Sequence, residues 1–200
     1  MQYCELCEVL SRFSSHFAVI TRRGKLLAFM NLVFFTCVFA AATASEFLLF
    51  PLPYLIESPH IFAGSFPVLL LSIFLFNLAV SAFAVVTLPG FAFFPLSTFF
   101  LLYRASFWGL LLSQQPTWNL LVAMPTLVFE GEGYALACLA GTVVGVSWIR
   151  PRWICAELGI SRAGALVKAL KECVVIYFSV VVFLFVAAVI EAATLTMIPM

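Results

Sequence analysis

Continuous apolar stretches, separated by short polar or proline-containing segments, make up most of this chain. Five of these stretches have about the 20 residues that an α-helix needs to cross the apolar layer of a membrane. A membrane β-barrel would instead alternate apolar and polar positions along short strands. The pattern therefore predicts an all-α polytopic membrane helix bundle with five transmembrane helices, over residues 26–44, 67–88, 91–113, 119–149 and 173–198.

The first 25 residues follow a different pattern. Their apolar side chains recur at alternating separations of four and three residues, at Leu6, Leu10, Phe13, Phe17 and Ile20. That spacing is typical of an amphipathic helix. We expect residues 1–25 to form a cytoplasmic helix that lies on the membrane surface or packs on a cytoplasmic loop of the protein itself. Residues 26–200 would form the transmembrane domain, in which a cytoplasmic segment at 150–172 holds a short helix capped by Ser161.

The basic residues predict the orientation of the bundle. With the N-terminus inside, nine of the ten Lys and Arg residues are cytoplasmic, namely Arg12, Arg22, Arg23, Lys25, Arg150, Arg152, Arg162, Lys168 and Lys171. Cytoplasmic loops of membrane proteins carry such an excess of positive charge. We therefore expect a multi-pass protein of the cell membrane with a cytoplasmic N-terminus and an external C-terminus.

Composition narrows the functional classes. The chain is 64% hydrophobic and 10% charged, so a soluble domain of 200 residues could not bury its apolar surface. The lipid bilayer is the expected partner, and nothing in the charge points to nucleic acid. The chain has no aspartate and no Gly-x-Ser-x-Gly element, which argues against an enzyme and predicts no cofactor. Cys4, Cys7 and His16 are one ligand short of a zinc site, so no metal is predicted either.

The stretch from 125 to 145 combines charge with small residues. Glu130 and Glu132 lie in an apolar span, where an ionisable group costs about 3 kcal/mol or more unless it finds a partner or water. Small residues then recur at every fourth position, at Gly133, Ala137, Gly141 and Gly145. Such a ridge lets a second helix approach closely. We expect that helix to be the last span, through its small residues Ala187, Ala188 and Ala192.

The span that contains this stretch is too long for a bilayer. As one helix, residues 119–149 would measure about 46 Å, against an apolar layer of ~30 Å. The helix must therefore tilt, protrude or break, and Pro125 and the Glu-Gly-Glu-Gly run mark where a break would fall. Pro89 and Gly90 predict a tight turn between the second and third spans, and residues 114–117 predict another after the third.

Three polar residues in different spans lie at one predicted depth. Counted from the outer ends of their spans, Asn77, Arg104 and Glu130 are about 14 to 17 Å deep. An arginine keeps its proton, which makes Glu130 the natural counter-ion of Arg104. We predict a buried polar cluster of Asn77, Arg104, Glu130, Glu132 and Glu191. It could be a fold-locking ion pair, the lining of a path for substrate or protons, or a catalytic group.

Several short motifs in these spans resemble the stage II sporulation protein M family. They are FLFNLAVSAF at 74–83, Gly90, Gly109, PTLVFEGEGYALACLAG from Pro125, and FLFVAAVIEAATLT near the C-terminus. The family has a Pro-His-Gly-x-x-Glu element and a last span ending in Ala-Ala-x-Ile-Glu. Pro125 and Glu130 keep the first spacing, with Thr126 in place of the histidine, and Glu191 ends the second element. The resemblance covers residues 67 to 200.

The resemblance implies a component of assembly rather than an enzyme. The sporulation member is an integral membrane part of the machinery that remodels peptidoglycan, and it works with cell-wall hydrolases. We therefore expect a non-enzymatic membrane scaffold that organises other membrane or cell-wall-remodelling proteins. The alternative is a small transporter or channel subunit, in which a broken helix at Gly131 and Gly133 supplies a polar site at Asn77, Arg104 and Glu130. Transport would favour a homodimer around a polar cavity.

Overall fold

The computed structural model describes residues 18–48, 65–113, 117–154 and 161–197. Most of the predicted N-terminal amphipathic helix lies outside these ranges, as do Cys4, Cys7 and His16. The proline-containing segment that follows the first span also lies outside them, together with most of the predicted turn at 114–117. Residues 18–22, the end of the predicted N-terminal helix, are helical.

All regular elements in the described residues are helices. They are α2 (Gly24–Leu48), α3 (Phe66–Leu75), the π-helix η2 (Phe76–Thr87), α4 (Leu88–Ala92), α5 (Phe94–Ser113), α6 (Thr117–Ile149), α7 (Pro151–Ile154) and α8 (Arg162–Met197). Five continuous helical stretches are long and apolar enough to cross a membrane: Gly24–Ser45, Phe66–Ala92, Phe94–Ser113, Ala123–Ile149 and Arg162–Thr196. The predicted fold class, an all-α bundle with five membrane-crossing helices, is confirmed.

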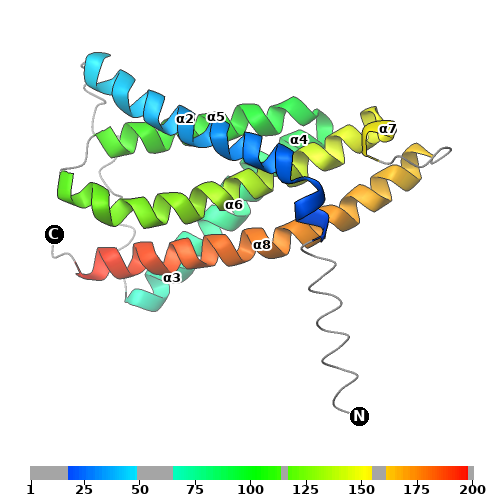
Figure 1. The fold of residues 1–200 in the computed structure, drawn as a ribbon. Helices are drawn as coiled ribbons and strands as arrows, with labels where there is room; N and C mark the ends of the chain where they lie inside the picture. The colour runs from blue at the N-terminus through cyan, green and yellow to red at the C-terminus, as the bar shows by residue number, and fades with distance from the viewer. Residues whose placement is uncertain (1–17, 49–64, 114–116, 155–160, 198–200) are drawn as a thin grey trace, which may run out of the picture.

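Helix α6 lies at the centre of this bundle (Figure 1). In its most apolar 18-residue window 83% of the residues are buried by the other helices, against 17–33% in the other four spans. It packs against α2, α5, α8 and the segment formed by η2 and α4, while α2 also packs along α5. The outer helices carry large exposed apolar side chains, such as Leu32 and Val174, which suit contact with lipid rather than water.

Helix α6 is continuous through the predicted break. It runs unbroken past Pro125, Gly131 and Gly133. Membrane helices tolerate proline because neighbouring groups compensate for the lost hydrogen bond. The glycines stay helical because neighbours pack tightly against them: a Cβ added at Gly131 would lie 2.7 Å from Phe34, and one added at Gly133 would lie 2.7 Å from Leu184. The excess length is therefore not relieved by a break.

Helix boundaries differ from the expected ones at two places. The cytoplasmic helix after Ser161 and the last span form one helix, α8, because one buried face runs through both, over Ala165, Ala169, Cys173, Ile176 and Val180. Ser161 caps this helix as predicted, since its Oγ accepts a hydrogen bond from the Gly164 N–H at 3.1 Å. The turn between the second and third spans falls at Phe93, whose backbone is extended (φ −149°, ψ 111°), and not at Pro89 and Gly90.

The second span contains a twelve-residue π-helix, which the sequence pattern did not predict. Its buried residues recur at separations of four and five: Asn77, Ser81, Ala82, Val86 and Thr87. The wider turn of a π-helix keeps all of them on one face, towards α6. π-Helical segments are rare and commonly occur at functional sites.

A buried polar network around Glu130

Glu130 lies on the inner face of α6, and its side chain is only 2% exposed. Side chains from two other helices satisfy both of its carboxylate oxygens. Asn77 of η2 donates through Nδ2 to Oε1 at 2.5 Å, and Trp108 of α5 donates through Nε1 to Oε2 at 2.9 Å. One carboxylate thus joins three spans, and its two oxygens receive the hydrogen bonds that a buried carboxylate requires.

Tyr134 extends this network by one turn of α6. Its hydroxyl donates to Asn77 Oδ1 at 3.1 Å and accepts a hydrogen bond from Arg104 Nη2 at 2.8 Å. The guanidinium carbon of Arg104 also lies 4.9 Å from the centre of the Tyr134 ring and 5.8 Å from that of Phe107. These distances are typical of cation–π contacts. Tyr134 therefore holds Arg104 both at its ring and at its hydroxyl.

The structure differs from the predicted ion pair between Arg104 and Glu130. Among the described residues, the two side chains form no salt bridge within 4.0 Å. Within the described part of the chain, hydrogen bonds link Arg104 to the carboxylate through Tyr134 and Asn77, while its charge still acts on Glu130 over a longer distance. The predicted shared depth of Asn77, Arg104 and Glu130 agrees with this arrangement. We call Asn77, Arg104, Trp108, Glu130 and Tyr134 the Glu130 network.

The other two predicted cluster residues occupy different places. Glu191 of α8 is half-buried and lies close enough for its charge to interact with those of Glu130 and Arg104. Glu132 faces another helix, because Asn31 of α2 donates through Nδ2 to both of its oxygens, at 3.0 and 3.1 Å. Glu132 therefore belongs to a separate contact between α2 and α6.

The ridge of small residues on α6 packs against three spans rather than one. A Cβ at Gly133 would meet Leu184 of α8, whereas one at Gly141 would lie 2.7 Å from the Thr87 carbonyl oxygen. At Gly145 an added Cβ would lie 3.0 Å from the backbone nitrogen of Phe94. The prediction that Gly141 packs on the alanines of the last span is wrong. Two of those alanines, Ala188 and Ala192, pack instead against Leu69 and Ile73 of α3.

Thr87 forms a second polar contact on this ridge. Its hydroxyl donates to the backbone carbonyl of Ala137 at 2.9 Å and lies 2.6 Å from the hydroxyl of Tyr177 on α8. These bonds tie the end of η2 to α6 and α8 about two turns along α6 from Glu130. Nothing in the sequence pattern indicated that Thr87 and Tyr177 would meet.

Two residues of the Glu130 network, in contrast, carried a sequence signal that the prediction missed. Trp108 lies four residues after Arg104, and Tyr134 lies four residues after Glu130. Residues four apart share one face of a helix. Each predicted charged residue therefore had an aromatic hydrogen-bonding group beside it on the same face.

The network consists of hydrogen bonds that bridge helices. Within the described part of the chain, no three His, Cys, Asp or Glu side chains lie close enough together to bind a metal ion. Both Glu130 oxygens are already engaged by N–H donors. The other charged groups here are Arg104, which is half-buried within the network, and Glu191 beside it. The arrangement can stabilise a helix junction, and at Arg104 it can also accept an anionic partner.

Fold and network together define a class, an all-helical multi-pass membrane protein with a polar network buried at mid-span. No protein-family model matches the chain, and neither a curated protein nor a solved structure does.

Proposed function

We propose that this protein is a non-enzymatic membrane scaffold, similar in kind to stage II sporulation protein M, which organises partner proteins in the cell membrane. The observation that carries this proposal is the engagement of Glu130. Both of its oxygens accept hydrogen bonds from neighbouring spans, as expected of a carboxylate that fixes the relative positions of helices. A carboxylate that acted on a substrate would keep an oxygen accessible.

The residues that carry the family resemblance support the same proposal. Asn77 and Glu130 bond to each other across two helices. Gly90 and Gly109 lie at close helix contacts: a Cβ at Gly90 would lie 3.0 Å from the Gly141 backbone, and one at Gly109 would lie 2.7 Å from Ala41. The shared motifs thus coincide with packing positions, which suits a common architecture with a structural role.

The proposed orientation places the N-terminus in the cytoplasm. All the described Lys and Arg residues except Arg104 gather where α2 and α8 begin and α6 ends (Figure 1). The excess of positive charge in cytoplasmic segments supports this placement. Arg22 and Arg23 both pair with Glu172 there, which ties the residues before the first span to the inner end of α8.

The scaffold proposal predicts that partner proteins contact the exposed outer surface of the bundle. A photo-crosslinking amino acid would replace, in turn, exposed residues on three spans: Leu32, Val68 and Val174. Buried Leu139 serves as the matched control. We expect at least one exposed position to give a discrete adduct that mass spectrometry identifies as a membrane or cell-wall-remodelling protein, and Leu139 to give none. Adducts with lipid alone at all three positions would contradict the proposal.

A small transporter or channel subunit is the second candidate, and Arg104 favours it. Its side chain is half-buried at mid-span, and among the described residues its Nε has no hydrogen-bond partner. Polar groups at this depth often line a path for ions or substrates. Purified protein in liposomes would decide between the two candidates. A transporter should raise the ion or proton flux above that of protein-free liposomes, and Arg104→Gln should abolish the increase. The scaffold proposal predicts that liposomes with the wild-type protein leak at the same rate as protein-free liposomes.

A further inference from the structure

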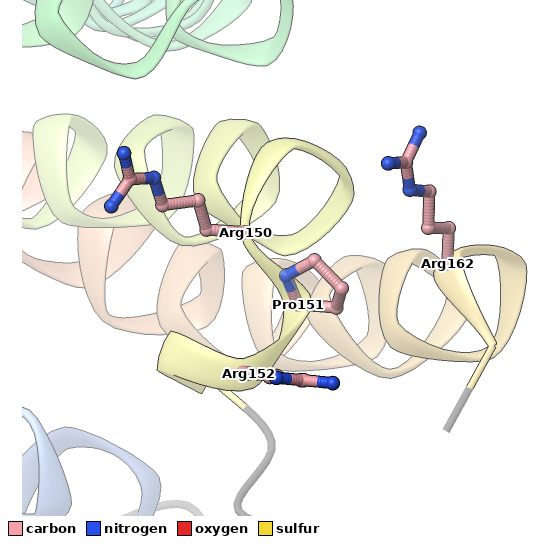
Figure 2. Close-up of a pocket in the computed structure, with 4 residues that line it drawn as sticks. All are labelled: Arg150, Pro151, Arg152 and Arg162. Atoms are coloured by element: carbon pink, nitrogen blue, oxygen red, sulfur yellow. The ribbon is translucent and has the colours of Figure 1, made fainter. Parts of the chain in front are cut away.

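The basic end of the bundle contains a hollow of about 390 Å³ lined by Arg150, Pro151, Arg152 and Arg162. Figure 2 shows Pro151 between Arg150 and Arg162, whose side chains rise on the same side, while Arg152 extends beneath the proline. The hollow lies where α6 ends and α8 begins, so two membrane-crossing helices deliver its lining. Among the residues that the structure describes, this lining carries no negative charge.

Local chain geometry brings the three arginines together. Arg150 follows the last residue of α6, and Pro151 then starts the short helix α7, which carries Arg152. Arg162 begins α8, where the positive end of the helix dipole disfavours a cation, and the first turn of that helix contains no acidic residue. Arg152 and Arg162 both line the hollow, and a bound anion would offset their like charges.

We infer that this hollow binds a phosphate group, carried by an anionic phospholipid headgroup or by free phosphate. Guanidinium groups donate paired hydrogen bonds that match phosphate oxygens. Basic pockets between membrane helices on the cytoplasmic side bind lipid headgroups of this chemistry. Arg152 and Arg162 are exposed, so a phosphate at the membrane surface can reach both. This site is separate from the Glu130 network; it rests on the orientation proposed above and not on the scaffold role.

The test compares binding by the full-length protein in non-ionic detergent micelles. One arm titrates dioleoylphosphatidylglycerol against dioleoylphosphatidylcholine, and the other titrates inorganic phosphate without lipid, both read by thermal unfolding. The variant R152Q/R162Q removes two charges from the hollow. The control K168Q/K171Q removes two charges from α8 next to the hollow without changing its lining.

We expect saturable stabilisation of the wild type and of the control, and an affinity roughly tenfold lower or worse in R152Q/R162Q. R152K/R162K, which keeps the charge but loses the paired geometry, should fall between them. A response to phosphatidylglycerol alone assigns the site to a lipid headgroup, and an equal response to phosphate assigns it to the free anion. No saturable response, or an equal loss in the control pair, would overturn the inference, because the attraction would then be diffuse.

Discussion

Tyr134 shows how a single residue decides the environment of a buried charge. Among the described residues, its hydroxyl accepts the only side-chain hydrogen bond between Arg104 and the rest of the Glu130 network. The ring beneath the guanidinium adds a cation–π contact at 4.9 Å. Arg104 thus has a hydrogen-bond acceptor and an electron-rich ring from one side chain, although it forms no salt bridge with a carboxylate of the described residues.

Removing that hydroxyl gives the first prediction. Tyr134→Phe keeps the ring but leaves Arg104 without its acceptor and Asn77 Oδ1 without its donor. We expect a loss of about 1–3 kcal/mol in the free energy of unfolding. Tyr103→Phe is the matched control, because Tyr103 is exposed on the same helix as Arg104, and we expect it to change stability by less than about 0.5 kcal/mol. Thermal unfolding in detergent measures the stability of both variants. If Tyr134→Phe changed stability no more than Tyr103→Phe, the Tyr134 hydroxyl would contribute nothing.

At the residue scale the sequence predicted which polar groups share a depth, but not how they pair. Counting residues along each span was enough to bring Asn77, Arg104 and Glu130 to one level. The pairing depends on helix rotation, which apolar spans leave poorly determined because most of their faces look alike. The Asn31–Glu132 contact arises from the same rotation, so that two glutamates two residues apart bind different helices.

At the scale of elements, α6 packs mainly through the close approach of neighbouring helices to its backbone. Gly141 faces Thr87 and Ser97, where η2 and α5 both touch α6. The small-residue spacing correctly predicted tight packing there. It could not predict which helix would pack, because a ridge of glycines fits any neighbour that reaches it.

A methyl group tests this contact and gives the second prediction. Gly141→Ala would place Cβ 2.7 Å from the Thr87 carbonyl oxygen and 3.1 Å from its Cα, both of which are backbone atoms. We expect destabilisation of about 1–3 kcal/mol. Gly24→Ala is the control, because a Cβ there meets nothing within 4 Å, and it should be neutral or stabilise by up to about 1 kcal/mol. If the two variants melt at the same temperature, η2 does not approach α6 this closely.

The π-helix is the element that sequence patterns could not reveal. In a water-soluble helix the apolar period shows how many residues make a turn. In η2 the exposed Phe76, Val80 and Phe83 are as apolar as the buried Ala82 and Val86. The three polar residues of the buried face, Asn77, Ser81 and Thr87, are too few to define a period. The period was therefore hidden, and an α-helix was the default expectation.

For the whole molecule, the arrangement requires opposite ends of α2 to face opposite sides of the membrane. The third prediction uses single cysteines in an otherwise cysteine-free protein. Ser58→Cys, between α2 and α3, should react with an impermeant maleimide from outside the cell, whereas Arg152→Cys should react only after the membrane is opened. Labelling of both from one side would mean that a helix between them does not cross the bilayer.

The sequence predicted five spans because membrane length and apolar composition are properties of each segment alone. The central position of α6 also had a sequence signal, since charged and small residues accumulate in that span. Its continuity did not, because whether a helix bends at Pro125 or at the glycines depends on the neighbours that pack there. The same limit explains the merged α8, whose buried face extends beyond the apolar stretch that marked the span.

The central claim is that the Glu130 side chain joins the spans of this bundle through direct hydrogen bonds, of which the bond to Asn77 is the one to test. A double-mutant cycle of Asn77→Ala and Glu130→Ala, measured by unfolding in a defined bilayer, tests it most directly. We predict a coupling energy of about 1 kcal/mol or more for this pair. The parallel cycle of Asn77→Ala with Glu132→Ala should be additive within about 0.5 kcal/mol, because Glu132 bonds to α2 instead. Additivity in the first cycle, or equal coupling in both, would contradict the account.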